Sequence, residues 1–270
     1  MIAFKLFVLN SLSESLFRFF SSFEKPFFEN ITIISARLNS SRFANKILVD
    51  IFGLPMVIRT AKQVSSLDKV VIATDTKEVY DLAKEHGFEA VMTSIDHNSG
   101  TDRINEAVNN LNLSDDEIIV NVQADEPFIE IDVVKAVINR VKEVKDCQNT
   151  LITSCYKEIN SQSADDPNLV KVVINNLEEA IYFSRAKIPY HRDGDENSTY
   201  FGHLGIYGFT KKSLNKFCSL NSSKLENIEK LEQLRAIDNG FKIAMVKVNS
   251  KSFGIDTKED LERALKIFSK

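Results

Sequence analysis

The chain has 270 residues, of which 43% are hydrophobic and 27% charged, so it is long enough to bury an α/β core, and we expect one large domain. Its net charge of -4, with Lys and Arg scattered along the sequence, argues against nucleic-acid binding, which requires a basic stripe. No segment reaches the ~20 apolar residues of a transmembrane helix, and we predict a cytoplasmic protein.

The first 30 residues differ from the rest because they hold eight of the nineteen Phe residues, separated by Ser-rich intervals. They contain no long unbroken apolar run followed by a small-residue cleavage site, which argues against a signal peptide. Their apolar spacing is helix-like, so they are either an amphipathic helix packing on the body or on a membrane surface, or an extension upstream of the domain. We treat residues 1–30 as an N-terminal extension of unclear role, followed by a single domain at 31–270.

From residue 31 the pattern alternates between strands and helices, which predicts a mainly parallel sheet with helices on both faces. Gly87 follows one helical pattern directly and is expected to end it. The predicted elements in this half are a strand at 31–34, a polar loop at 35–46, helices at 57–64, 77–86, 102–111 and 131–144, and strands at 69–73, 90–92, 117–122 and 150–156.

In the second half the alternation of strands and helices is interrupted and then resumes. A hairpin is predicted at 170–174 and 180–183, then a strand at 204–209, a helix at 211–217, a long helix at 227–239, a strand at 243–248 and a helix at 257–268. The three cysteines, Cys147, Cys155 and Cys218, form no CxxC pair, and we expect reduced core thiols.

The loop after the first strand carries three cations, Arg37, Arg42 and Lys46, where ligands of an open α/β sheet bind. Guanidinium forks and an ammonium group together suit a polyphosphate, including a departing pyrophosphate. The loop has no GxxxxGK[ST] motif, and a solvated charged loop is the alternative interpretation.

Two carboxylates, Asp125 and Glu126, follow the apolar strand at 117–122. Mg²⁺ prefers one or two protein carboxylates together with phosphate oxygens. Asp125 is therefore a candidate ligand, and Asp256 is the candidate second one, with Gly254 allowing a tight backbone before it. The alternative is that Asp256 only caps the next helix.

Further polar segments qualify as ligand contacts, each weakly on its own. Ser99 or Thr101 could cap the helix that follows, leaving exposed amides that face an anion. Arg185, His203 and Tyr207 would make a polar lining suited to a sugar acid, although His203 is also typical of a hydrogen-bonded core histidine. The segment containing Glu232 and Gln233 is equally typical of an amphipathic helix surface.

The order of the motifs from residue 31 onward resembles the 3-deoxy-manno-octulosonate cytidylyltransferases. The segments that carry the resemblance are IISARLNSSRFANKILVDIFGLPM, VVIATD, DHNSGTDRI, IIVNVQADEP, KVV, YFSRAKIP, HLGIYGF, LEQLRAIDNG and GIDTKEDLERA. The resemblance implies a Rossmann-like nucleotide-diphospho-sugar transferase fold with a mixed, mainly parallel sheet. It also implies a homodimer that makes CMP-3-deoxy-manno-octulosonate and pyrophosphate from CTP, using Mg²⁺, for lipopolysaccharide biosynthesis.

The resemblance also assigns roles to individual residues. It places the metal carboxylates at Asp125 and Asp256, and catalysis at these two residues with Arg37 and Lys46. The implied nucleotide contacts are Ala36, Arg37, Arg42, Lys46, Ser99, Gly100 and Asp125. The implied sugar-acid contacts are Gln123, Arg185, His203, Tyr207, Glu232 and Gln233.

The chain departs from the family pattern at several positions. The first loop has Ser35 in place of Pro and the run 43–45 in place of Leu-Pro-Gly, while Leu54 replaces Lys and Ala124 replaces Gly. These changes leave two alternatives: a cytidylyltransferase for a related acid, such as the 8-amino analogue or sialic acid, or a catalytically weak paralogue that acts as a binding protein.

Overall fold

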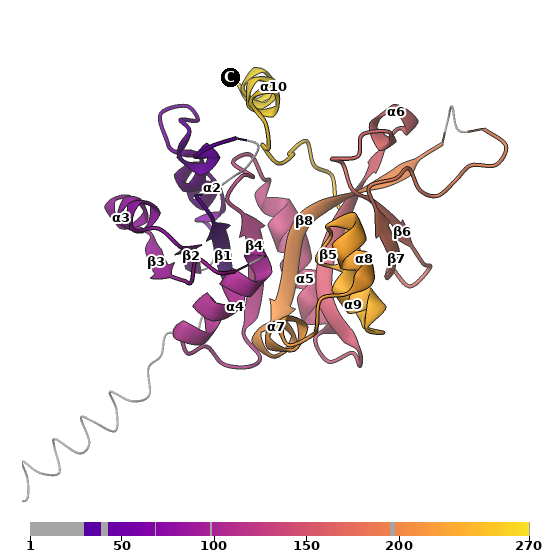
Figure 1. The fold of residues 1–270 in the computed structure, drawn as a ribbon, viewed down its shortest axis with the longest axis horizontal. Coiled ribbons are helices and arrows are strands. Elements are labelled where there is room, and N and C mark those ends of the chain that lie inside the picture. The colour runs from indigo at the N-terminus through magenta and orange to yellow at the C-terminus, as the bar shows by residue number, and fades with distance from the viewer. Residues whose placement is uncertain (1–29, 39–42, 68, 98, 195–197, 270) are drawn as a thin grey trace, which may run out of the picture.

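The computed structural model describes residues 30–38, 43–67, 69–97, 99–194 and 198–269, so residues 1–29 of the N-terminal extension lie outside the described residues, while Asn30 belongs to the first strand. Within these ranges the strands form one sheet in the order β3-β2-β1-β4-β8-β5-β9, with the hairpin of β6 and β7 attached to β8 (Figure 1). The strands are β1 Asn30–Ala36, β2 Lys69–Thr74, β3 Glu89–Met92, β4 Ile118–Gln123, β5 Thr150–Ile159, β6 Lys171–Ile174, β7 Ala180–Ser184, β8 Tyr200–Thr210 and β9 Lys242–Lys247.

The sheet is mixed, as predicted. Strands β1, β2, β3 and β4 pair in parallel, and β5 pairs in parallel with β9. Strand β8 runs antiparallel to both β4 and β5 and joins the two halves. The carboxyl ends of β1 and β4 therefore meet the beginning of β8 at one edge, which is where an open α/β sheet binds its ligands.

Helices cover both faces of the sheet because the buried side chains of each strand alternate between two apolar clusters. In β1, Ile31 and Ile33 belong to one cluster and Ile34 and Ala36 to the other. The second face is covered by α2 Met56–Val64, α3 Lys77–Glu85 and α5 Ile131–Val144. The first face is covered by α4 Gly100–Asn110, α7 Lys211–Cys218 and α9 Leu234–Asp238. Figure 1 shows α4 and α7 in front of the sheet and α5 behind it.

The predicted helix at 227–239 is wrong, because two short helices with a turn between them occupy this region. Helix α8 Lys224–Glu229 begins at a capping box on Ser223 and ends at Lys230, whose φ of 54° is left-handed. Helix α9 starts only at Leu234. The break puts Glu232 and Gln233 in the turn between the helices rather than on a helix surface.

The other predicted elements are present with small shifts at their ends, and Gly87 follows α3 with a φ of 81°, as expected for a helix stop. The structure adds the short helices η1 Lys46–Leu48 and α6 Ser161–Ala164, and ends in α10 Lys258–Phe268. Cys155 is buried and Cys218 partly buried, but Cys147 is exposed in the turn after α5, so the core-thiol prediction is wrong for Cys147. None of the helices in the described ranges is long and apolar enough to cross a membrane.

Candidate active site

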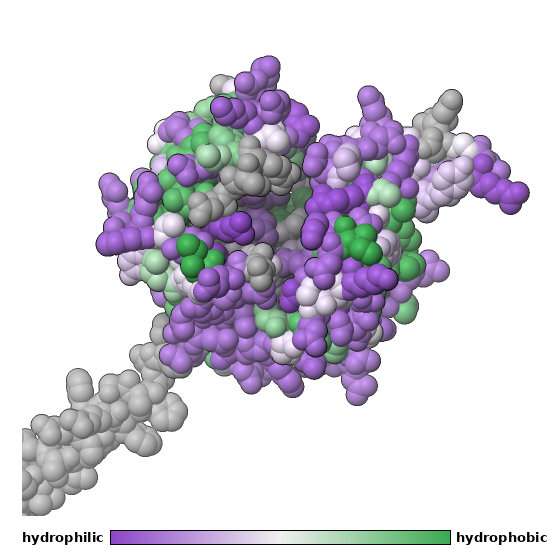
Figure 2. All heavy atoms as spheres, in the orientation of Figure 1, coloured by the Kyte–Doolittle hydropathy of each residue, from purple (hydrophilic) through white to green (hydrophobic). Residues whose placement is uncertain are grey.

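The candidate site lies at the carboxyl ends of β1 and β4, beside the segment that leads into α10 (Figure 1). Figure 2 shows a depression on this face, between the part of the molecule that carries α2 and the part that carries α8, bordered mostly by hydrophilic residues. Four separate segments contribute to the site, namely the turn before η1, the turn after β4, the amino end of α4 and the segment before α10.

The centre of the site is a cation held between two carboxylates. The Lys46 ammonium donates to Asp125 Oδ2 at 2.5 Å and to Asp256 Oδ1 at 2.7 Å, although 210 positions separate Lys46 from Asp256 in the chain. Burial alone would lower the pKa of Lys46, but the charges and hydrogen bonds of the two carboxylates outweigh it and raise the pKa above its usual value. The sequence-predicted residues Lys46, Asp125 and Asp256 are thus brought together.

Asp256 does not cap α10, which corrects one of the predicted alternatives. The cap is Thr257, whose hydroxyl accepts from the backbone N–H of Asp260 in a capping box. The Asp256 carboxylate is therefore available to the site. The backbone N–H of Ile255 donates to the Asp125 carbonyl at 2.9 Å, which ties the two acidic segments together. A Cβ at Gly254 would make only ordinary contacts, the nearest 3.6 Å away at Glu126 Oε1, so the space at this position does not by itself require glycine.

A buried polar network behind these carboxylates was not predicted. Glu126 Oε2 accepts from the Ser252 hydroxyl at 2.8 Å, and Lys157 donates to the Ser252 carbonyl at 2.8 Å. Burial, followed by the neighbouring Asp125 charge, raises the pKa of Glu126 to about 7. This network holds the turn after β4 against the segment before Asp256. The adjacent acidic pair at 125–126 was its only sequence signal.

The amino end of α4 packs tightly against the ends of β1 and β4. Ser99 is the helix cap, as predicted, and accepts from the Asp102 N–H at 3.1 Å. A Cβ on Gly100 would lie 2.9 Å from the Ser35 hydroxyl, so a larger residue would displace the Ser35 side chain. The Ser35 hydroxyl donates to Gln123 Oε1 at 3.1 Å. Exposed backbone N–H groups at such a helix end favour an anion nearby.

Two of the predicted sugar-acid contacts lie in the turn before α9. Thr101 donates to Glu232 Oε1 at 2.8 Å, and Tyr207 donates to Gln233 Oε1 at 3.0 Å. Burial raises the pKa of both Glu232 and Tyr207 above their usual values. The break between α8 and α9 therefore joins the amino end of α4 to the face of β8.

His203 lies next to Tyr207, with 5.6 Å between the ring centroids, and is hydrogen-bonded through Nε2 to the Ser154 hydroxyl at 2.8 Å. Burial lowers the pKa of His203 to about 3, so the ring is neutral in the folded protein. The core-histidine interpretation describes these contacts correctly, and the ring also borders the predicted sugar-acid region.

The hydrogen bonds that Arg185 makes to backbone carbonyls lead to a different part of the molecule. The Arg185 guanidinium donates to the backbone carbonyls of Pro167, Glu229 and Lys230, which fasten it to the end of α8. Ala36 is buried at the end of β1 and the next residue, Arg37, is exposed. Arg42 lies outside the described residues.

A second unpredicted feature is a buried ion pair that connects α4 to the sheet. The buried Arg103 guanidinium pairs with Asp75 at 2.7 Å and donates to the Thr93 hydroxyl at 2.6 Å. These bonds connect α4 to the ends of β2 and β3. They therefore help to position Ser99 and Gly100, at the amino end of α4, relative to the sheet. The motifs that contain Asp75 and Arg103 were visible in the sequence, but nothing in their spacing indicated an ion pair.

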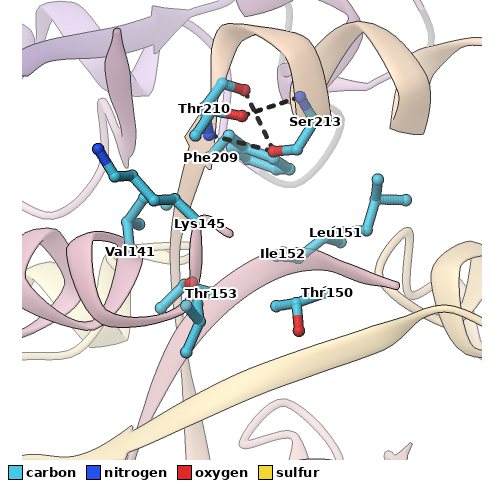
Figure 3. Close-up of a pocket in the computed structure, with 11 residues that line it drawn as sticks. Val141, Lys145, Thr150, Leu151, Ile152, Thr153, Phe209, Thr210 and Ser213 are labelled. Atoms are coloured by element: carbon cyan, nitrogen blue, oxygen red, sulfur yellow. Dashed lines mark hydrogen bonds between the residues drawn. The ribbon is translucent and has the colours of Figure 1, made fainter. Parts of the chain in front are cut away.

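Figure 3 shows a small pocket at a different place, between the end of α5, the start of β5 and the end of β8. Its lining mixes aliphatic side chains with polar ones, and the capping pair Thr210 and Ser213 lies at one side. Because β8 runs antiparallel to β4, its end lies at the opposite edge of the sheet from Asp125. The pocket is therefore separate from the candidate site.

The chain is similar to known cytidylyltransferases. A family described as cytidylyltransferase matches residues 31–243. The 3-deoxy-manno-octulosonate cytidylyltransferase of Wolinella succinogenes is 50% identical over 239 residues, covering 87% of this chain and 98% of the relative. The enzyme of the same name from Nitratiruptor sp. is 53% identical over 232 residues, covering 86% of this chain and 96% of the relative.

A solved structure of a CMP:2-keto-3-deoxy-manno-octonic acid synthetase complexed with CTP is 34% identical, with a TM-score of 0.79, and covers 89% of this chain and 98% of that one. These similarities, together with the α/β sheet and the residues at its carboxyl edge, show that the chain belongs to the cytidylyltransferase family, among the 3-deoxy-manno-octulosonate cytidylyltransferases.

Proposed function

We propose that the chain transfers CMP from CTP to 3-deoxy-manno-octulosonate and releases pyrophosphate. The names of relatives that are 50% and 53% identical over nearly their whole length support this reaction. The observation that carries it in this structure is the convergence of Lys46 with Asp125 and Asp256 beside the amino end of α4. A triphosphate needs cations, a metal-binding carboxylate pair and backbone donors, and the site offers all three.

The two carboxylates fit Mg²⁺. Asp125 and Asp256 both lie within hydrogen-bond distance of the Lys46 ammonium nitrogen. A metal ion placed near the position of that nitrogen could therefore contact both carboxylates. In the described ranges no cluster of three His, Cys, Asp or Glu side chains forms a metal site, and Mg²⁺ requires only one or two carboxylates when phosphates complete its ligands. When bound, Mg²⁺ would neutralise phosphate charge and lower the pKa of the acceptor hydroxyl.

The chemical step needs no side-chain nucleophile. The anomeric hydroxyl of the sugar acid loses its proton to water and its oxygen forms a bond to the α-phosphorus of CTP, while the bond from this phosphorus to the departing pyrophosphate breaks in line. We assign to Lys46 and Arg37 the stabilisation of the negative charge that develops on the pyrophosphate. When CTP binds, the Lys46 ammonium would move from the two carboxylates to the phosphates, because the phosphate oxygens offer it an equivalent ion pair.

The acceptor would bind along the face formed by Gln123, Tyr207, Glu232 and Gln233. Tyr207, Glu232 and Gln233 are connected by hydrogen bonds to one another or to α4, so their positions are set before the acceptor arrives. The neutral ring of His203 completes this lining. We further propose a cytoplasmic homodimer that supplies an activated sugar acid for lipopolysaccharide biosynthesis.

The test is pyrophosphate release with each of the four nucleoside triphosphates, with and without Mg²⁺. The acceptors are 3-deoxy-manno-octulosonate, its 8-amino analogue and sialic acid. We expect release with CTP, the first acceptor and Mg²⁺ together. Preference for another acceptor would reassign the substrate, and no release with any pair from folded protein would contradict the proposed activity. Asp125→Asn should abolish the Mg²⁺-dependent release.

A further inference from the structure

Helix α10 is attached to the body of the protein through a small apolar cluster of its own. Figure 1 shows this helix beyond the carboxyl edge of the sheet rather than on either of its faces. Ala264 is buried in the cluster, and Leu261, Leu265 and Phe268 are partly buried against it. The cluster is separate from the two that fill the faces of the sheet. The position of α10 therefore depends on this third cluster.

The third cluster joins the three segments that carry the charged residues of the site. Its buried members include Ile51, Phe128 and Ile255. Phe128 follows Asp125 by three positions, and Ile255 directly precedes Asp256. Ile51 lies in the turn after η1, the short helix that begins with the lysine of the site. Segments that are far apart in the chain thus share one apolar base close to the charged group.

Asp256 and α10 form one structural unit. The backbone N–H groups of Asp256 and Thr257 both donate to Asp260 Oδ2, at 3.2 and 3.0 Å. Asp260 belongs to the first turn of α10. The Asp256 carboxylate therefore moves with the helix, and the orientation of the helix decides where this carboxylate lies.

This unit is fastened at both ends. At its beginning the Ile255 N–H donates to the Asp125 carbonyl at 2.9 Å. At its end the Phe268 ring stacks on the Phe128 ring, with 4.2 Å between the centroids and 7° between the planes. At about 1.5 Å per residue the stack lies roughly 18 Å along the helix from Asp256, so Phe268 does not touch a ligand bound there. The first attachment alone would let the helix pivot, and the stack fixes its direction.

The ring that receives Phe268 is itself held in place. Phe128 is 7% exposed, and the Arg59 guanidinium of α2 lies 5.7 Å from its centroid. The Phe52 ring meets Phe128 edge-on, with 6.2 Å between the centroids. The stack therefore ties the end of α10 to a fixed point on the turn that also carries Asp125.

A shared metal ion makes the orientation of α10 important. Mg²⁺ binds oxygen ligands at about 2.1 Å in a nearly ideal octahedron, so a displacement of about 1 Å in one carboxylate breaks its contact. Asp256 is the less enclosed of the two carboxylates, with a side chain that is 37% exposed against 22% for Asp125. Its position depends accordingly more on the unit to which it belongs.

We propose that Phe268 is a positioning residue: by stacking on Phe128 it fixes the direction of α10, and so holds the Asp256 carboxylate where it can share a metal ion with Asp125. This inference rests on the proposed function for the metal and the nucleotide. It adds a residue that is remote from both.

The test compares Phe268→Ala with two controls. Phe268→Tyr keeps the stacked ring, and Ile267→Ala changes the adjacent residue of the same helix, which is 53% exposed. We expect Phe268→Ala to raise the Mg²⁺ concentration for half-maximal turnover about fivefold, while kcat at saturating Mg²⁺ and the KM for the sugar acid stay unchanged. Both controls should match wild type. A Phe268→Ala variant that melts at a lower temperature but keeps the wild-type Mg²⁺ dependence has lost only stability, and this result would overturn the proposal.

The partner ring provides a double-mutant cycle. Because Phe128 and Phe268 contact each other, the double variant Phe128→Leu with Phe268→Ala should need no more Mg²⁺ than the more affected single variant. Additive effects would mean that the two rings act separately, which also contradicts the proposal.

Metal binding without turnover separates this inference from the proposed function. Mn²⁺ binding is measured by electron paramagnetic resonance with CTP and no sugar acid, for wild type, Phe268→Ala and Asp256→Asn. Weaker binding by both variants supports the positioning role even if no sugar acid is converted. Equal binding by wild type and Asp256→Asn removes both the metal assignment and this inference. If Asp256→Asn binds more weakly but Phe268→Ala binds as wild type does, this inference fails and the proposed function stands.

Discussion

The strongest prediction about stability concerns the buried histidine. His203 is 8% exposed, its Nε2 bonds to the Ser154 hydroxyl, and its ring contacts the rings of Phe183 and Tyr207. Burial lowers the pKa of His203 to about 3, whereas the same side chain in the unfolded chain has an ordinary pKa of about 6.5. Between these two values the unfolded state binds a proton that the folded state does not. The free energy of unfolding must therefore fall as the pH falls below the unfolded-state value.

The size of this effect follows from linkage. From about pH 7.5 to about pH 5.5 the folded ring stays neutral, and protonation of the unfolded state lowers the free energy of unfolding by about 1.4 kcal/mol. His203→Gln keeps a group that can bond to Ser154 but does not titrate. The variant should therefore lack this part of the pH dependence, whatever its own stability.

The assay is urea unfolding of wild type and His203→Gln, followed by circular dichroism at both pH values. The stability difference between the two proteins should change by about 1.4 kcal/mol in favour of the variant at the lower pH. His86→Gln, at the end of α3, is the control for loss of any one histidine. Parallel pH curves for wild type and His203→Gln would refute the reasoning, because they would mean that the folded protein protonates His203 as readily as the unfolded chain.

Three further predictions use other parts of the structure. Lys46→Met should lower turnover about a hundredfold and, because it removes an ammonium group that competes with a metal for both carboxylates, tighten Mn²⁺ binding without nucleotide, measured by electron paramagnetic resonance. Gly208→Ala should lower the free energy of unfolding by about 1–3 kcal/mol with both KM values unchanged, since its Cβ would lie 2.5 Å from a valine methyl of α5; a normal urea midpoint would contradict this. Thr257→Ala removes the cap of α10 and should cost about 1 kcal/mol, seen as faster amide exchange confined to that helix.

Much of the fold and the centre of the site could be predicted from the sequence because the signals are local. Hydrophobic periodicity identified helix 131–144 with the bounds that α5 has, and the buried strand before Asp125 fixed the position of that carboxylate at the sheet edge. The pairing of Asp125 with Asp256 was predicted from the chemistry of Mg²⁺, and the structure brings both to Lys46. The magnesium itself remains a prediction.

The failures come from interactions between distant segments. The apolar spacing at 227–239 favours one helix, but the left-handed Lys230 breaks it, and Glu232 is then held by Thr101 from α4. Asp256 could not be distinguished from a helix cap because Thr257, the true cap, is its neighbour. No periodicity could indicate that the guanidinium of Arg185 bonds to carbonyls at the end of α8.

Two departures from the family pattern in the first loop fit the contacts of the site. Asn45 stands where the family has Gly, and its φ of 54° is left-handed, a conformation that Asn tolerates better than most residues. It precedes Lys46 directly, so the backbone still places the ammonium between the two carboxylates. Ser35, in place of Pro, gains a hydroxyl that donates to Gln123. Both substitutions are thus compatible with the contacts that the site needs.

Two other departures, Ala124 and Leu54, lie away from the ligand face. Ala124 is 4% exposed and belongs to the apolar cluster under α2, so its methyl group fills the core, while its carbonyl accepts from the Thr60 hydroxyl at 2.9 Å. Leu54 packs against the same cluster. A protein that had lost catalysis would have no need to keep Lys46, Asp125 and Asp256 in mutual contact, since a partly buried charge cluster stabilises a fold poorly. The structure therefore favours an active enzyme over a binding-only paralogue.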